Sequence, residues 1–340
     1  MIPPEWLDQA ARRLEGQIER TPLTYDPGLN LYLKWENRQV TGSFKIRGAF
    51  NKVLALEPWE QQRGLVTASA GNHGQGVAIA GRRVNAPVTV FASDHAVPTK
   101  LEAMRQLGAE IRLVSGGYEA AEREAQVYAH RAGATWVSPY NDGQVIAGQA
   151  TIALEILAQL REIHDAPPPR VIVAPVGGGG LISGLGVALN RFSPGSRPLL
   201  VGAQSEASPF FHALFYQGSQ AGVVELESLA DGLAGAVEDG SMTIPLVRSL
   251  VDRIVLVREE AIARAIAGVW HRYGEKIEGS AAAALAAALS GCVPEQPAVV
   301  IISGANIQPE QHLRICSEYS APSFSAGISA GEDLREGFVG

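Results

Sequence analysis

Lys45 lies in an unusual setting for a cation, within the stretch TGSFKIRGAF at residues 41–50. Ser43 is a typical N-cap residue and apolar residues recur after it at helical spacing, so we expect a helix that begins near Lys45. The positive end of a helix dipole disfavours a cation in the first turn, and a positive field lowers the pKa of an amine. A neutral amine is a nucleophile, so Lys45 is a candidate catalytic residue.

A glycine-rich turn, PVGGGGLISG at residues 175–184, follows an apolar run and opens a helical pattern. Glycines allow several backbone N–H groups to point at one anion, and the N-terminus of the helix adds its dipole. The turn therefore suits a phosphate. A tight turn without a ligand is the alternative, but four consecutive glycines cost much chain entropy for that role alone. The usual nucleotide-binding signatures do not fit the sequence.

Two further stretches could bind or orient a ligand. In ASAGNHGQG, at residues 68–76, the side chains of Ser69, Asn72 and His73 join backbone N–H groups where a helix begins. Such a turn suits a carboxylate, although Ser69 and Asn72 could serve only as caps. In VVIISGAN, at residues 299–306, Ser303 follows a buried run, at the end of the strand where parallel sheets bind ligands.

The elements that must position these residues alternate between strand and helix, which predicts the α/β class with parallel sheets. The expected strands cover residues 31–35, 64–69, 87–92, 110–115, 171–176, 198–204, 253–257 and 298–303, and helical patterns lie near 73–83, 98–107, 117–132, 144–163, 181–191 and 259–273.

The alternation is tight between residues 48 and 141, where the elements are short. We therefore expect two domains: a small one at 48–141 and a large one made of 1–47 and 142–319. Residues 320–340 are rich in Gly and Ser, and their composition predicts a flexible tail.

Composition excludes several classes of protein. Lys and Arg are scattered and the net charge is −7, which argues against a nucleic-acid-binding surface. Two cysteines, Cys292 and Cys316, are too few for a disulfide framework and fit a reducing cytoplasm. The N-terminus does not resemble a signal peptide. Residues 171–189 carry no charge, but their glycines and Pro175 make a membrane span a poor interpretation. The zinc-binding motifs H-E-x-x-H and paired C-x-x-C do not occur.

Three of these features are complementary: a candidate lysine nucleophile, a phosphate turn and a carboxylate turn. A lysine that forms a Schiff base beside a phosphate site indicates pyridoxal phosphate, and the carboxylate turn indicates an amino-acid substrate.

The same motifs resemble those of the fold type II pyridoxal-phosphate enzymes, in the branch of the threonine/serine dehydratases and serine racemase. The resemblance runs from RTPL at residues 20–23 to SGAN at 303–306, and includes ADGLAG at 230–235 and EGSAA at 278–282. It implies a tryptophan synthase β-like fold, with two parallel-sheet domains, flanking helices and pyridoxal 5'-phosphate in the cleft between the domains.

The resemblance also implies a role for each motif residue. Lys45 would form the aldimine with the cofactor, Phe44 would lie against its ring, Asn72 would bond the ring hydroxyl, and Ser303 would face the ring nitrogen. The cofactor phosphate would be held by Gly177, Gly178, Gly179, Gly180 and Leu181, and the substrate carboxylate by Ser69, Gly71, Asn72 and His73.

The chain departs from the family pattern at two positions. Racemase members have a serine where this chain has Ala70, so racemisation is not expected. Some members bind a divalent ion through an acid that matches Glu206 and a second acid six positions later, which here is His212. Hard divalent cations prefer oxygen ligands, so we expect no metal.

The resemblance therefore implies a cytoplasmic, catabolic L-threonine/L-serine ammonia-lyase, acting as a homodimer on a small hydroxy amino acid. Three alternatives stay open: a dehydratase of another 3-hydroxy amino acid such as 3-hydroxyaspartate, a serine racemase, and a non-catalytic binder of the cofactor.

Overall fold

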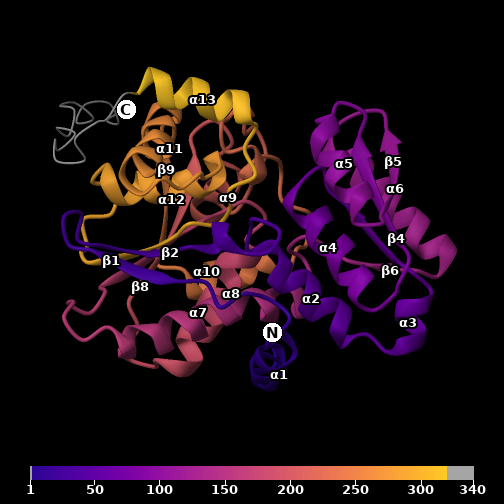
Figure 1. Ribbon diagram of the computed structural model, residues 1–340, viewed down its shortest axis with the longest axis horizontal. Helices are drawn as coiled ribbons and strands as arrows, with labels where there is room; N and C mark the ends of the chain where they lie inside the picture. Colours follow the sequence, from indigo (N-terminus) through magenta and orange to yellow (C-terminus); the bar gives the residue numbers. More distant parts are fainter. Residues whose placement is uncertain (1, 320–340) are drawn as a thin grey trace.

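The computed structural model describes residues 2–319, so the predicted flexible tail lies outside the described residues. The chain folds into an α/β structure around two separate sheets, one of six strands and one of four. Figure 1 shows the four-stranded sheet and its helices on the right, beside the larger unit that contains both the first and the last part of the described chain.

The larger sheet has the strand order β1-β2-β10-β7-β8-β9. Only the β1–β2 pair is antiparallel. The strands are β1 (Leu23–Asp26), β2 (Leu31–Lys34), β7 (Val171–Pro175), β8 (Leu199–Ser205), β9 (Arg253–Val257) and β10 (Ala298–Ile301).

The smaller sheet has the order β5-β4-β3-β6, and all its pairs are parallel. Its strands are β3 (Leu65–Ala68), β4 (Val88–Ser93), β5 (Glu110–Val114) and β6 (Thr135–Trp136). All four lie between residues 48 and 141, whereas every strand of the larger sheet lies outside that range. The domain boundaries themselves stay a prediction.

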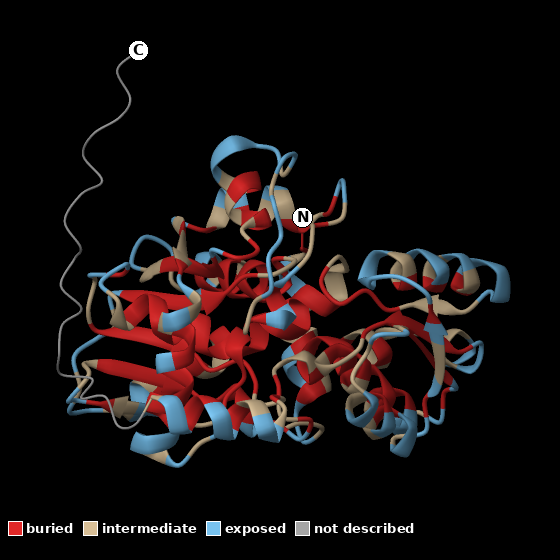
Figure 2. Ribbon diagram, turned by 90° about the horizontal axis from the view of Figure 1, so that it is seen from above, coloured by how far each residue is buried: buried red, intermediate tan, exposed pale blue. Residues whose placement is uncertain are grey.

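Helices cover both sheets, and their buried faces form most of the core (Figure 2). They are α1 (Pro4–Leu14), α2 (Lys45–Ala55), α3 (Pro58–Gln62), α4 (Asn72–Arg83), α5 (Pro98–Gln106), α6 (Tyr118–Ala132), α7 (Gly143–Glu162), α8 (Gly180–Phe192), α9 (Phe210–Gln217), α10 (Thr243–Leu250), α11 (Glu259–Tyr273), α12 (Gly279–Leu289) and α13 (Pro309–Glu318), with the short 3-10 turns η1 (Glu36–Arg38) and η2 (Asp231–Leu233). The uncharged stretch 171–189 forms β7 and part of α8, and no helix within residues 2–319 is long and apolar enough to cross a membrane.

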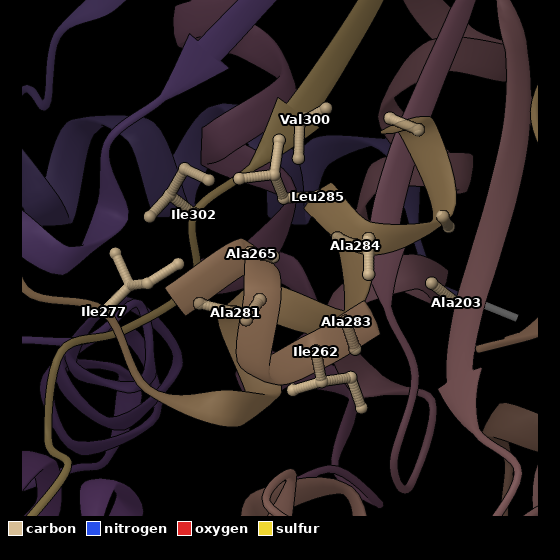
Figure 3. Packing of buried hydrophobic residues seen from close by; sticks show 14 of the residues in the cluster. Ala203, Ile262, Ala265, Ile277, Ala281, Ala283, Ala284, Leu285, Val300 and Ile302 are labelled. Carbon is tan, nitrogen blue, oxygen red and sulfur yellow. The ribbon is translucent and has the colours of Figure 1, made fainter. Parts of the chain in front are cut away.

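All eight predicted strands form, with ends shifted by no more than two residues, but the prediction missed β1 and β6, which are short. It also missed the helices α1, α3, α9, α10, α12 and α13. The sequence of α12 is mostly alanine. Helix α12 is buried on all sides among β8, β10 and α11, so its sequence lacks the amphipathic period by which helices are recognised. Figure 3 shows Ala281, Ala283 and Ala284 in this core, close to side chains from α11 and β10.

The helix that begins at Lys45 packs closely on α7 because both helices carry a glycine at the contact. A Cβ on Gly148 of α7 would lie 2.5 Å from the carbonyl oxygen of Arg47 and 2.7 Å from the Cα of Gly48. Any larger side chain would push the helices apart, so this contact fixes where α2 lies.

A buried network of charged side chains also fixes the position of helix α2. The Arg47 guanidinium contacts Glu36 of η1 and Glu155 of α7, each at 2.7 Å, and Lys34 of β2 contacts Glu155 at 2.5 Å. Burial alone would lower the pKa of Arg47, but the two carboxylates outweigh burial and raise it above its ordinary value. Two cations and two carboxylates therefore compensate one another inside the protein.

We predict that Arg47→Met lowers the free energy of unfolding by about 3–5 kcal/mol, because it leaves Glu36 charged and unpaired in the core. Denaturant titration measures the loss. Arg20→Met is the control, since the pair Arg20–Glu162 has half or more of each side chain exposed and should change stability by less than about 1 kcal/mol. Equal losses in both variants would contradict the prediction.

Candidate active site

Residues 42–44, which immediately precede α2, form backbone hydrogen bonds with the distant segment 303–305. The Phe44 N–H donates to the Ser303 carbonyl at 3.0 Å, and the Ala305 N–H donates to the Gly42 carbonyl at 2.9 Å. Gly42 has φ of +70°, which favours glycine. Ser303 follows β10, so this pairing places the start of α2 at the carboxyl end of a central strand.

The predicted N-cap role of Ser43 was wrong. The cap position of α2 is Phe44, and no side chain caps the helix. Ser43 instead forms a β-bridge with Gly304, and its buried hydroxyl has no hydrogen-bond partner among the described residues. Ser43 lies one position before the cap, so its hydroxyl does not bond the first free N–H groups of the helix.

The Lys45 amine lies between two parts of the chain. Nζ donates to the Pro139 carbonyl at 3.0 Å and is 5.4 Å from the centre of the Phe44 ring. Burial lowers the pKa of Lys45 to about 8, although the nearby Glu278 carboxylate raises it. A substantial fraction of the amine is therefore neutral near physiological pH, as a nucleophile or a proton acceptor requires.

The glycine turn leads into α8, and no side chain within the described residues caps that helix. Gly179 is the cap residue, with φ of +84°. A Cβ on Gly177 would lie 3.1 Å from the Leu233 Cα, and one on Gly180 3.0 Å from the Tyr140 Cα. The turn is thus a close-fitting, glycine-only loop at the N-terminus of a helix, as an anion site requires.

The dipeptide Pro139–Tyr140 joins Lys45 to this turn. Pro139 accepts from the Lys45 amine, and the Tyr140 ring occupies the space where a Gly178 side chain would lie. Thr243 of α10 supports the turn from another side, because its hydroxyl donates to the Gly178 carbonyl at 2.7 Å. Neither Tyr140 nor Thr243 was found from the sequence, since neither belongs to a motif.

The turn at residues 69–73 connects β3 to α4. The Gly71 N–H donates to the Ser69 hydroxyl at 3.1 Å, so these two residues hold the loop in shape. His73 is buried, and its Nε2 lies 3.0 Å from the Val137 carbonyl. Burial first, and the Lys45 charge second, lower the pKa of His73 to about 3, so the ring is neutral. The influence of Lys45 on His73 places this loop beside the amine.

Asn72 contacts a glutamate that the sequence reasoning did not single out. Its Nδ2 donates to both Glu278 oxygens, at 2.9 and 3.0 Å, and its Oδ1 accepts from Asn306 Nδ2 at 2.6 Å. The motif EGSAA contains Glu278 and SGAN contains Asn306, but only the fold brings them to Asn72.

Glu278 is buried, and its pKa is raised from 4.5 to about 7. Burial is the main cause, and Asp231 adds to it, whereas the hydrogen bond from Asn72 and the charge of Lys100 act against it. Lys45 and Glu278 are therefore an amine and a carboxyl group that both titrate near neutral pH.

The resemblance led us to consider two positions, Glu206 and His212, for a divalent ion. Glu206 is exposed, and the His212 ring packs against Tyr216 with 4.7 Å between centres. Within residues 2–319, no three His, Cys, Asp or Glu side chains are close enough to share a metal ion.

The residues present fit pyridoxal phosphate. A lysine amine of lowered pKa can react with its aldehyde, and a glycine cradle at a helix N-terminus can hold its phosphate. The structure connects the amine to this cradle through Pro139–Tyr140 and to the carboxylate turn through His73. The individual roles predicted for Phe44, Asn72, Leu181 and Ser303 stay predictions.

Comparison with known proteins agrees with this geometry. A family model described as pyridoxal-phosphate dependent enzyme matches residues 14–304. An L-threonine ammonia-lyase of Thermotoga maritima is 39% identical over 325 residues, which cover 94% of this chain and 79% of that protein.

Two solved structures have similar folds. Threonine deaminase isoform 2 of Solanum lycopersicum superposes with a TM-score of 0.82 at 28% identity, covering 93% of this chain and 87% of that one. Serine racemase of Dictyostelium discoideum superposes with a TM-score of 0.80 at 32% identity, covering 89% of this chain and 98% of that one.

We predict that Glu278→Gln stabilises the cofactor-free protein in a pH-dependent way. A carboxyl group with a raised pKa in the folded state costs stability as pH rises from 4.5 to about 7, because it must ionise inside the protein. The variant should match the wild type below pH 4.5 and exceed its unfolding free energy by about 1–3 kcal/mol above pH 7. Denaturant titrations across this range measure the difference.

Glu260→Gln is the control for this titration. Glu260 lies on the exposed surface beside Arg264, at 2.7 Å, so its replacement should produce no comparable dependence on pH. A Glu278→Gln effect that is the same at every pH would refute the assignment of a raised pKa to Glu278.

Proposed function

The chain belongs to the family of pyridoxal-phosphate-dependent enzymes, and we propose that it is an ammonia-lyase acting on L-threonine and L-serine. The reaction is a β-elimination that converts the hydroxy amino acid to a 2-oxo acid and ammonia. The observation that carries the proposal is the Lys45 amine of lowered pKa, positioned between a phosphate cradle and a carboxylate turn. The threonine ammonia-lyase relative supports the choice of reaction.

Pyridoxal 5'-phosphate, when bound, supplies an aldehyde that holds an amine and a ring that withdraws electrons from Cα. Lys45 would hold the cofactor and then, as a free amine, accept the Cα proton of the substrate. The Pro139 carbonyl would keep Nζ directed toward the cleft, since it accepts a hydrogen bond from it at 3.0 Å. Burial lowers the pKa of this amine toward neutral, so more of it is unprotonated near neutral pH than for an exposed lysine, which suits proton transfer.

The remaining residues would bind and orient. Residues 177–181 would hold the phosphate through backbone N–H groups, and the turn at 69–73 would hold the substrate carboxylate. Ser303 would present a neutral hydroxyl to the ring nitrogen. A carboxylate there would keep that nitrogen protonated, whereas a hydroxyl would not, so the charge at Cα would be short-lived and elimination would outrun slower reactions.

The charges around the cleft disfavour the alternative substrate 3-hydroxyaspartate. Burial first, and the charge of Glu238 in the loop before α10, raise the pKa of Glu122 of α6, so these two carboxyl groups lie near each other. The charge of Asp231 likewise raises the pKa of Glu278, which Asn72 contacts. A second substrate carboxylate would be repelled by these groups, whereas the methyl group of threonine would not.

The racemase alternative is disfavoured at Ala70, which lies between β3 and α4 and has no exchangeable proton. A passive cofactor binder would have little need of a buried amine such as Lys45. Location in the cytoplasm, a role in catabolism, a homodimeric state and independence from metal ions remain proposals drawn from the resemblance.

The first test uses the wild type and Lys45→Ala with a panel of hydroxy amino acids. We expect the wild type to release ammonia from L-threonine and L-serine, and 3-hydroxyaspartate to give a kcat/KM at least about tenfold lower. Lys45→Ala should release none and should hold no cofactor that borohydride can fix to the protein. Near wild-type turnover by Lys45→Ala would overturn the mechanism, and a preference for 3-hydroxyaspartate would overturn the substrate assignment.

The second test separates lyase from racemase. Return of a proton to the other face of Cα needs a donor within roughly 2.6–3.2 Å or through one water, and Ala70 offers none. The wild type with L-serine in deuterated water should therefore give pyruvate and almost no D-serine by chiral chromatography. Ala70→Ser should produce some D-serine and gain activity on D-serine. Abundant D-serine from the wild type would require withdrawal of the lyase assignment in favour of a racemase.

A further inference from the structure

An ion pair crosses between the two sheets at the edge of the candidate site. Lys100 of α5, beside the smaller sheet, contacts Asp231 of η2, on the larger unit, with 3.2 Å between Nζ and Oδ2. Only 19% of the Lys100 side chain is exposed, against 67% for Asp231. The lysine side chain is therefore held against the larger unit rather than extended into solvent.

The stem of Lys100 lies over the turn that is proposed to bind the substrate carboxylate. Its Cδ is 4.0 Å from the position that a Cβ on Gly71 would occupy, and within residues 2–319 no other heavy atom outside residues 70–72 comes as close. The charge of Lys100 also reaches Glu278, whose pKa responds to it and, in the opposite sense, to Asp231. Lys100, Asp231 and Glu278 thus lie around one edge of the 69–73 turn.

Asp231 belongs to a turn that is fixed to the phosphate loop. A Cβ on Gly177 would lie 3.1 Å from the Leu233 Cα, and one on Gly232 would lie 2.8 Å from the Ser280 hydroxyl of α12. The Leu233 N–H donates to the Ala230 carbonyl at 2.8 Å, which closes the turn. The turn that carries Asp231 is therefore closely packed, and this packing fixes the backbone of Asp231 beside Lys100.

We propose that Lys100 and Asp231 form a clamp that holds the 69–73 turn in its carboxylate-binding position, and that Lys100 is a positioning residue for the substrate carboxylate. The ion pair connects the phosphate loop, through η2, to the carboxylate turn, through α5. An anion that enters beside Gly71 meets the ammonium group, so binding and closure of the clamp favour each other. The inference rests on the proposed function only in requiring an amino-acid substrate.

The test measures binding of L-alanine to the holoenzyme by its absorbance change, because L-alanine has the amine and carboxylate but no leaving group. Lys100→Met should raise the Kd for L-alanine and the KM for L-threonine about tenfold, with kcat changed less than about threefold. Asp231→Asn should have a smaller effect, about threefold, because its charge is more exposed. The double variant should be no worse than Lys100→Met, since the two residues act through one contact.

Two variants control for indirect effects. Lys100→Arg keeps the positive charge and should retain most of the affinity for L-alanine. Arg105 lies on the same helix, and its one ion-pair partner within residues 2–319 is Glu102 of that helix, at 3.5 Å. Arg105→Met removes this cation and should change neither the Kd nor the KM. A general effect of charge on α5 would instead appear in Arg105→Met as well and would refute the clamp.

Hydrogen exchange of the backbone amides gives a readout that does not depend on turnover. In the holoenzyme, peptides that cover residues 69–76 should exchange faster in Lys100→Met than in the wild type, and L-alanine should protect them less. If L-threonine is not a substrate but these differences appear, the proposed function fails and the clamp stands. Unchanged exchange and unchanged L-alanine affinity in a folded Lys100→Met protein would overturn the clamp.

Discussion

The candidate site depends on the backbone pairing between residues 42–44 and 303–305. Two hydrogen bonds, from Phe44 N–H to the Ser303 carbonyl and from Ala305 N–H to the Gly42 carbonyl, fix the start of α2 against the end of β10. The side chain of Asn306 strengthens the contact, since its Nδ2 donates to the Thr41 carbonyl at 2.9 Å. Lys45 directly follows Phe44 in the sequence. The pairing therefore fixes the backbone position from which the Lys45 side chain extends to the Pro139 carbonyl.

Helix α2 carries a half-buried cation, Lys45, and a buried one, Arg47, only two residues apart, and their environments shift their pKa values in opposite directions. Arg47 points into a core where Glu36 and Glu155 pair with it, so its pKa is raised and its charge is permanent. Lys45 points toward the Pro139 carbonyl, and there desolvation dominates and lowers its pKa to about 8. The paired cation anchors the helix, and the poorly compensated one is available for chemistry. The side chains on neighbouring elements, rather than the helix itself, determine that the pKa of Arg47 is raised and that of Lys45 is lowered.

The smaller unit contributes to the site through contacts with the larger one. Asn72 contacts Glu278, and Lys100 of α5 contacts Asp231, so the turn at residues 69–73 and the neighbouring helix α5 are held by side chains of the larger unit. The glycine turn at residues 177–180 is close to the same residues, because η2 packs on Gly177. The proposed cofactor and substrate sites are therefore connected through the residues around η2, and this connection is the basis of the proposed clamp.

The sequence by itself determined the α/β class, the eight main strands and the turns at 41–45, 69–73 and 177–181, because glycines and strand–helix junctions are local signals. It could not determine that burial, rather than the helix dipole, lowers the pKa of Lys45, because burial depends on the packing of the whole fold. It also could not determine the unpaired state of the Ser43 hydroxyl, because Ser43 pairs with Gly304 far along the chain. Glu278, Asn306, Tyr140 and Thr243 were also beyond its reach as individual site residues. Each contacts its partner only across the tertiary fold, and no spacing along the chain records such a distance.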